Sequence, residues 1–229
     1  MNLEQYKKRK AETIHPYELV RSFCTSCWQP EFNCFCSQIK KFDPKIEFVV
    51  LIHPLESHRR IATGRMSFLS LKNAHIIRGS EFKNNYKVNR LLSEKGYRNM
   101  ILAPGRTAKD LTSMSNSEKE AEFTGDQKLR IFVIDGTWSN AKGMVNKTPE
   151  LLKLPKICFT PPAPSNIRVR KQPNSNCYCT LEAIHHTIEL IGHSQGFDVK
   201  SRLHDNLFKP FNWMVEGQLE RLKAGKLWR

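Results

Sequence analysis

The stretch from Arg130 to Val145, RIFVIDGTWSNAKGMV, passes from an apolar, β-branched segment directly into DGTW at positions 135–138. Such a segment predicts a buried strand, and the residues after it are typical of the start of a helix. Two interpretations of Asp135 are open at this point. Its side chain caps the following helix, or it lies at a ligand site, because open parallel α/β sheets bind ligands at the carboxyl ends of their strands.

Similar apolar segments lie before and after this one along the chain, and helical stretches separate them. Strands that alternate with helices indicate a mainly parallel α/β sheet. The further strands are expected at residues 46–52, 74–79, 98–105 and 156–162. Helices are expected at residues 56–73, after Asp135, at 180–193 and at 203–228, the last one interrupted at Pro210, and the least regular structure at 107–125 and 161–176.

The length and composition fit one globular domain with a small appendage, since the chain has 229 residues, of which 39% are hydrophobic. No apolar run reaches the roughly 20 residues that span a bilayer, and the first residues lack the apolar core of a signal peptide. We therefore expect a soluble, cytoplasmic protein without a membrane partner. We also expect it to be a monomer.

The charge of the chain is strongly positive, with 37 Lys and Arg against 22 Asp and Glu and a formal net charge of +15. Nucleic acid is the usual partner of such an excess, because Lys and Arg displace counterions from phosphates. An anionic membrane surface and plain solubility remain alternatives. The segment 151–181 contains basic residues and no acid. It is therefore a candidate phosphate-binding surface, with Arg168, Arg170 and Lys171 as candidate contacts.

Four of the seven cysteines lie in the stretch CTSCWQPEFNCFC, as a C-x2-C pair and a C-x-C pair separated by six residues. Four thiolates can surround Zn²⁺ tetrahedrally, and a full set of protein ligands leaves no open position for catalysis. We therefore expect a structural zinc ion, although an iron–sulfur cluster or redox thiols also fit the spacing. The predicted ligands are Cys24, Cys27, Cys34 and Cys36.

Aromatic residues alternate with these cysteines at positions 23, 28, 32 and 35. We expect them mostly to pack within the zinc-binding segment, with stacking on a nucleobase as the alternative. Three smaller expectations concern other residues. His185 and His186 are expected in solvent, Cys158 in the core, and the C-x-C pair at positions 177 and 179 is not expected to bind zinc alone.

Neither a G-x-G-x-x-G motif nor a P-loop follows any predicted strand, which argues against a dinucleotide or nucleoside triphosphate site. Small or polar turns follow the strands instead, as HPLES with ATGR, as APGRTA and as DGTW, and NSNCYCTLEA precedes a helix. Together with the cysteine cluster and IRVRKQP, these motifs occur in the order found in the DTW-domain family, which the sequence resembles over most of its length. The family is named for its Asp-x-Thr-Trp signature, here Asp135, Thr137 and Trp138.

This resemblance implies a fold, a reaction and a set of site residues. The fold is a SPOUT-like knotted sheet with helices on both faces, and the reaction is transfer of the 3-amino-3-carboxypropyl group of S-adenosylmethionine to N3 of a tRNA uridine, with release of methylthioadenosine. The implied catalytic residues are Asp135, Thr137 and Trp138. The implied cofactor-binding residues are Leu102, Ala103, Pro104, Gly105, Asp135, Gly136, Cys179, Thr180, Leu181 and Glu182. The implied RNA-binding residues are Arg65, Arg168, Arg170 and Lys171.

One residue departs from the family pattern, because Cys179 stands where a serine usually precedes the TLEA run. A thiol is a weaker hydrogen-bond donor than a hydroxyl, which weakens a cofactor contact at this position. We expect residues 1–43 to form the zinc-binding segment and residues 44–229 the catalytic domain. Two other functions remain as alternatives, a SPOUT-like RNA methyltransferase and a zinc-ribbon RNA-binding module without catalysis.

Overall fold

The computed structural model describes residues 4, 23–57, 59, 61–165 and 177–223. A six-stranded sheet forms its centre, with the strand order β2-β1-β5-β3-β6-β4 and parallel pairing throughout. The parallel α/β sheet predicted from the alternating pattern is confirmed. The strands are β1 (Glu47–Ile52), β2 (Ala74–Arg78), β3 (Tyr97–Leu102), β4 (Lys109–Asp110), β5 (Lys128–Asp135) and β6 (Lys156–Cys158).

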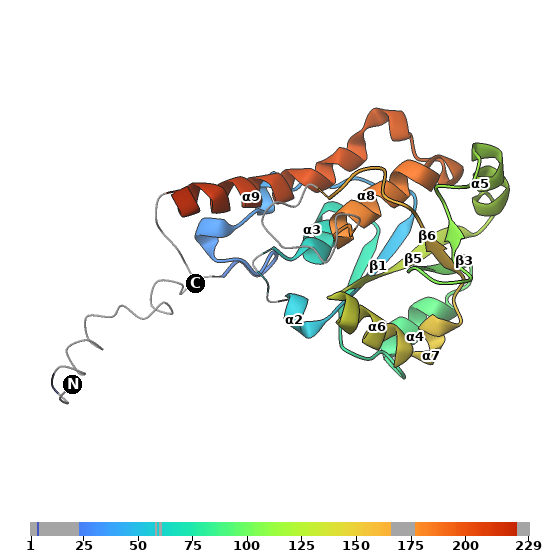
Figure 1. Ribbon diagram of the computed structural model, residues 1–229, viewed down its shortest axis with the longest axis horizontal. Coiled ribbons are helices and arrows are strands. Elements are labelled where there is room, and N and C mark those ends of the chain that lie inside the picture. The colour runs from blue at the N-terminus through green and yellow to red at the C-terminus, as the bar shows by residue number, and fades with distance from the viewer. Residues whose placement is uncertain (1–3, 5–22, 58, 60, 166–176, 224–229) are drawn as a thin grey trace.

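Helices cover both faces of this sheet (Figure 1). In the part of the chain that the structure describes, each helix is too short or too polar to cross a membrane. The α-helices are α2 (Pro54–Ser57), α3 (Thr63–Ser70), α4 (Tyr86–Ser93), α5 (Asn116–Phe123), α6 (Trp138–Asn146), α7 (Pro149–Leu152), α8 (Thr180–Ile191) and α9 (Phe208–Lys223). The 3-10 helices are η1 (Glu31–Asn33), η2 (Cys36–Gln38), η3 (His193–Gln195), η4 (Val199–Ser201) and η5 (Leu203–Leu207).

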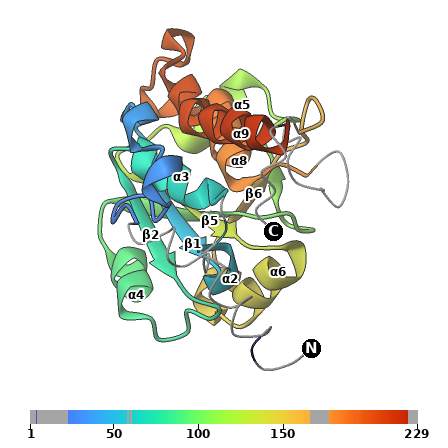
Figure 2. The same ribbon diagram turned by 90° about the vertical axis from the view of Figure 1, so that its left-hand side faces the viewer.

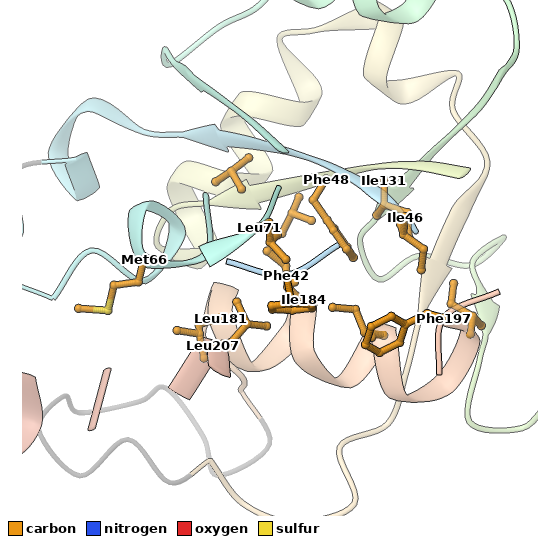
Figure 3. Close-up of a cluster of buried hydrophobic side chains, with 14 of the residues drawn as sticks. Phe42, Ile46, Phe48, Met66, Leu71, Ile131, Leu181, Ile184, Phe197 and Leu207 are labelled. Carbon is orange, nitrogen blue, oxygen red and sulfur yellow. The ribbon is translucent and has the colours of Figure 1, made fainter. Parts of the chain in front are cut away.

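Two apolar layers hold these helices to the sheet, one on each face. Alternate residues of β1 point to opposite faces, so that Phe48 belongs to one buried cluster and Val49 to the other. Residues of α3, α8 and α9 complete the first cluster, and residues of α4, α6 and α7 complete the second. Figure 3 shows the first layer, with Phe48 and Ile131 of the strands above Leu181 and Ile184 of α8.

Three strands end together at the centre of the carboxyl edge of the sheet. β5 lies between β1 and β3, with Asp135 opposite Ile52 and Val133 opposite Leu102. The segments that follow these strands therefore begin side by side. In parallel α/β sheets this edge is the usual place for a ligand.

The cysteine-containing segment packs against the sheet domain. Cys27 and Phe35 are fully buried and belong to the same apolar cluster as α8 and α9. Figure 2 shows this segment, in blue, beside α3. A short segment of this kind gains a core by packing on a larger one.

Three expectations about individual elements are wrong in detail. Residues 107–125 contain β4 and α5, and α5 begins with a capping box in which Ser115 and Glu118 exchange hydrogen bonds. The helix expected at 56–73 is two helices, α2 and α3. Pro210 does not interrupt the last helix, because α9 begins at Phe208 and its first turn needs no proline N–H.

Candidate active site

Asp135 is a buried carboxylate at the last position of β5, with an exposed fraction of 6%. Its Oδ1 accepts a hydrogen bond from Thr180 Oγ1 at 2.7 Å. Its backbone oxygen accepts a hydrogen bond from the backbone N–H of His53, at the end of β1, at 2.8 Å. The strand and the helix α8 together hold this acid in one orientation at the carboxyl edge of the sheet.

Gly64 provides the space that the Asp135 carboxylate occupies. It lies in the first turn of α3, and a Cβ atom at this position would be 2.3 Å from Asp135 Oδ2 and 3.0 Å from Val50 Cγ1. Any side chain here would displace the carboxylate. Gly64 was not among the predicted site residues, although it is the glycine of the ATGR motif.

The helix cap after β5 belongs to Thr137 and not to Asp135. Thr137 Oγ1 accepts a hydrogen bond from the backbone N–H of Asn140 at 3.3 Å, which makes Thr137 the N-cap of α6. The cap interpretation of Asp135 is therefore wrong. Trp138 is 54% exposed, and Met144 is the residue of α6 that lies in the core.

The turn after β3 lies beside this site. Leu102 pairs with Val133 of β5, and the backbone N–H of Ala103 donates to Ile157 of β6 at 3.0 Å. The next two residues, Pro104 and Gly105, are exposed. The predicted cofactor-binding turn therefore has a fixed start and an open end at the carboxyl edge.

The N-terminus of α8 supplies the contact to Asp135 and its own cap. Cys179 Sγ accepts a hydrogen bond from the Glu182 N–H at 3.4 Å, and Glu182 Oε2 accepts one from the Cys179 N–H at 2.9 Å. Burial, together with the Glu182 charge, raises the pKa of the Cys179 thiol. Cys179 therefore caps the helix as a neutral thiol, the role that serine often has at the start of a helix. Thr180 contacts Asp135, whereas Leu181 lies in the core and Glu182 also accepts from Ser165.

The predicted RNA-binding arginines have different positions. Arg168 and Arg170, with Lys171, lie outside the described residues. Arg65 is 7% exposed, and its Nη1 donates to the backbone oxygen of Ser26 at 3.1 Å. The guanidinium carbon lies 3.6 Å from the centre of the Trp28 ring. Arg65 thus connects α3 to the cysteine segment.

The four cysteines of this segment form a group that fits a metal ion. Their sulfur atoms all lie within 4.8 Å of one another, with 3.5 Å between Cys24 and Cys36 and 3.6 Å between Cys27 and Cys34. Ligands about 2.3 Å from a tetrahedral zinc ion are about 3.8 Å apart. Hydrogen bonds from the backbone of Cys27 and Ser26 lower the pKa of Cys24 to about 6, whereas burial raises the pKa of the Cys27 and Cys36 thiols.

The aromatic residues of the segment do not all pack inward as expected. Phe35 is fully buried, whereas Phe23 is 58% exposed and Trp28 is 43% exposed. The side chain of Phe32 lies outside the described residues. The segment therefore has one aromatic residue in the core and at least two at the surface.

The histidines of α8 do not lie in solvent as expected. The side chain of His185 is 13% exposed, and its Nε2 is 2.8 Å from Asp205 Oδ1. His185, Glu189, His204 and Asp205 bring their donor atoms within 4.8 Å of one another. Arg202 already forms ion pairs with both carboxylates of this group. The group is therefore a charge-paired network that joins α8 to η5.

His186 and Cys158 are both partly buried. The His186 ring packs edge-on against Phe159, with 4.7 Å between the ring centres. Cys158 lies at the end of β6 and is less buried than expected, and burial raises the pKa of its thiol.

Comparison with known proteins identifies a family for this arrangement. The profile of the DTW domain matches residues 21–219. The chain is 24% identical over 207 residues to tRNA-uridine aminocarboxypropyltransferase 2 of Drosophila melanogaster, covering 87% of this chain and 76% of the relative. It is 24% identical over 208 residues to the enzyme of the same name from Mus musculus, covering 87% of this chain and 64% of the relative.

A plant relative is similar over a shorter range. The chain is 23% identical over 191 residues to tRNA-uridine aminocarboxypropyltransferase A of Arabidopsis thaliana, covering 72% of this chain and 70% of the relative. No solved structure matches the chain.

Proposed function

The chain belongs to the DTW domain family, and we propose on this basis that it is a tRNA-uridine aminocarboxypropyltransferase. In this proposal it transfers the 3-amino-3-carboxypropyl group of S-adenosylmethionine to N3 of a tRNA uridine. The net charge of +15 suits a polyanionic substrate. Family membership carries the proposal, and the geometry around Asp135 supports it.

The Asp135 carboxylate is the group to which we assign the proton transfer. Uridine N3 is a poor nucleophile while it is protonated, and a positioned base contributes typically 10²–10⁴-fold to such a reaction. Asp135 accepts the N3 proton, the N3 electron pair forms the bond to Cγ of the donor, and the C–S bond electrons leave with sulfur as neutral methylthioadenosine. S-adenosylmethionine supplies the sulfonium leaving group for this step.

Thr180 and Gly64 position the acid in this mechanism. The Thr180 hydroxyl holds Oδ1, while the missing side chain of Gly64 gives Oδ2 its space. A carboxylate held from two sides stays aligned with a bound nucleotide, and alignment itself supplies several kcal/mol toward catalysis. An alternative role for Asp135 is a hydrogen bond to the amino group of the donor. Loss of that contact would raise KM for the donor, whereas loss of a base lowers kcat.

We assign the donor site to the turns that meet at this edge. The turn at residues 102–105 follows the strand beside β5, Gly136 follows Asp135 in the chain, and Thr180 at the N-terminus of α8 contacts Asp135. In the proposal, backbone groups of these three segments bind the adenosine and carboxylate parts of the donor. The Trp138 indole, which is largely exposed just after the acid, provides an apolar surface for the substrate. Arg168, Arg170 and Lys171 are assigned to RNA phosphates or to the donor carboxylate, because arginine binds either anion with two hydrogen bonds.

The proposal has three further parts, which concern the domains, the topology of the sheet, and the location and oligomeric state of the protein. Residues 1–43 form a segment folded by zinc, and residues 44–229 form the catalytic domain. In this proposal the sheet has the SPOUT-like knotted arrangement, with helices on both faces. The protein acts as a cytoplasmic monomer.

Product mass tests this proposal directly. The purified protein is incubated with unmodified tRNA transcripts and S-adenosylmethionine, and the nucleosides are analysed by mass spectrometry. The proposal expects uridine to gain one aminocarboxypropyl group, with methylthioadenosine as the second product. A gain of one methyl group would instead identify a methyltransferase, and an unchanged tRNA that still binds would identify a binding module without catalysis.

A further inference from the structure

The Trp28 side chain is a large apolar surface that the zinc-binding segment leaves open. It is 43% exposed, whereas Phe35 of the same segment is fully buried. One face of the indole is covered by the Arg65 guanidinium, whose central carbon lies 3.6 Å from the ring centre. Arg65 is itself 7% exposed and bonded to Ser26. The ring is therefore held in place by a buried group and faces outward.

The backbone at Trp28 gives a second, independent observation. Its φ angle is +57°, in the left-handed region that bulky residues rarely adopt. The position closes the turn after the Cys24–Cys27 pair, where the Trp28 N–H donates to the Cys24 oxygen at 2.8 Å. Glycine would adopt this conformation without strain. A strained tryptophan at such a position indicates that the side chain has a use of its own.

We propose that Trp28 is a stacking platform for an unpaired nucleobase of the tRNA, and that it thereby helps to select the substrate. This inference deepens the proposed function and rests on it. Base–aromatic stacking suits an indole with one fixed face, and the net charge of +15 suits the phosphates of the same RNA strand. Arg65 polarises the ring from behind and does not contact the RNA.

The position of Trp28 relative to the acid supports this assignment. Arg65 packs against Trp28, and its neighbour Gly64 packs against the Asp135 carboxylate. Consecutive Cα atoms are about 3.8 Å apart, so that the platform and the acid are both anchored at one end of α3. In the proposal, one RNA segment contacts both. A base on Trp28 would then place a nearby uridine at Asp135.

The test measures tRNA affinity without S-adenosylmethionine, so that it does not depend on turnover. Trp28→Gly removes the indole and also relieves the backbone strain. It should retain its zinc, yet bind unmodified tRNA transcripts about 5- to 150-fold more weakly. Trp28→Phe, which keeps an aromatic face, should recover most of the affinity. Perfect duplex RNA, which offers no unpaired base, should bind equally to the wild type and the Gly variant.

A matched control is Tyr86→Ala, since Tyr86 is an exposed aromatic residue on α4, at the other face of the sheet. It should bind tRNA like the wild type. Wild-type affinity of Trp28→Gly would overturn the inference. If the Gly variant lost its zinc, Trp28→Leu would replace it in the comparison of tRNA affinities, because Leu keeps apolar bulk without an aromatic face. Equal binding of the Leu and Phe variants would overturn the inference, and tight binding of Phe alone would support it.

This outcome is separable from that of the proposed function. Absence of aminocarboxypropyl transfer by the wild type would reject the function, while tRNA affinity that depends on Trp28 would still stand. Conversely, suppose that the wild type transfers the group and Asp135→Asn does not, but that Trp28→Gly binds tRNA as tightly as the wild type. That result would reject the stacking role of Trp28 alone.

Discussion

Thr180 Oγ1 donates a 2.7 Å hydrogen bond to Asp135 Oδ1, which joins the first residue of α8 to the last residue of β5 across 45 positions of the sequence. Both residues are more than nine-tenths buried. A hydrogen bond to a carboxylate in such a place is stronger than one in water, because little solvent competes for it. The orientation of the acid therefore depends on α8 as well as on its own strand.

Replacement of Asp135 by Asn should separate charge from shape. Asn keeps the size of the side chain and an oxygen that accepts from Thr180, but it cannot take a proton. Turnover should fall about 100-fold or more, while zinc content and melting temperature stay close to those of the wild type. Asp126→Asn, at an exposed position, is the control. Turnover near that of the wild type would leave Asp135 without a catalytic role.

Thr180→Val removes the hydroxyl and keeps the branched shape of the side chain. The buried Asp135 carboxylate then loses a donor, and the free energy of unfolding should fall by about 1–3 kcal/mol. Single-turnover rates should fall as well, because the acid is held less firmly. Thr180→Ser keeps the hydroxyl and should restore both quantities. Equal rates for the Val and Ser variants would show that the hydrogen bond does not position the acid.

Gly64→Ala should inactivate the protein through one added methyl group. Its Cβ would be 2.3 Å from Asp135 Oδ2, so that the carboxylate or α3 must move. Gly143→Ala in α6 is a matched control, because a Cβ there meets nothing within 4 Å. Glycine inside a helix costs roughly 0.5–1 kcal/mol relative to alanine, so the control should be slightly more stable and fully active. Calorimetry measures the stability of both variants, and turnover measures their activity. Full activity of Gly64→Ala would contradict the prediction.

Cys27→Ser should remove zinc from the protein. Serine is a poor zinc ligand, and a site with three thiolates loses the closed tetrahedron that folds the segment. Metal analysis should find about one zinc per wild-type chain and little in the variant, whose N-terminal segment should become sensitive to proteases. Cys158→Ser, at a cysteine outside the cluster, should keep its zinc. Full zinc content in the Cys27 variant would contradict the assignment.

Glu47 should govern part of the stability at low pH. Burial alone would raise its pKa, but hydrogen bonds from His75 and Arg130 and the charge of Arg130 lower the pKa to about 2. Because this value lies below that of the unfolded chain, the ionised group stabilises the fold above about pH 4.5. That stabilisation is lost as the pH falls toward 2.

Glu47→Gln should therefore be less stable than the wild type at pH 7, and the difference should shrink between pH 4.5 and 2. Urea unfolding at a series of pH values measures it. If the difference in the free energy of unfolding did not change with pH, the charge of Glu47 would contribute nothing to stability.

All the strands except β4, together with α8, could be predicted from the sequence because their patterns are local. The apolar run before Asp135 became β5, and the run after residue 45 became β1. The helix α5 was missed because its sequence, NSEKEAEF, is almost entirely polar, although its Ser115–Glu118 capping box was readable. A capping box thus indicates the start of a helix, but less strongly than a periodic pattern of apolar residues does.

The candidate site could be predicted only in part. Motif order placed Asp135, Thr137 and Thr180 on the site list, but not the contact between Asp135 and Gly64, which are 71 positions apart. Such a contact depends on how α3 packs on β1 and β5, and the spacing of apolar residues in the sequence does not give that orientation. The exposure of Trp138 could not be predicted for the same reason, since helical spacing does not state which face meets the core.

The strand that carries the acid is fifth along the chain but lies between the first and the third in the sheet. During synthesis, β1 and β3 leave the ribosome well before β5. Until β5 follows, the strand edges that pair with it remain unpaired. Open strand edges pair readily with other chains. A polypeptide that stops short of residue 128 would therefore be prone to aggregate. In a full-length chain, the event that joins β1 to β3 is also the event that delivers Asp135, so that these two strands cannot be joined without the acid.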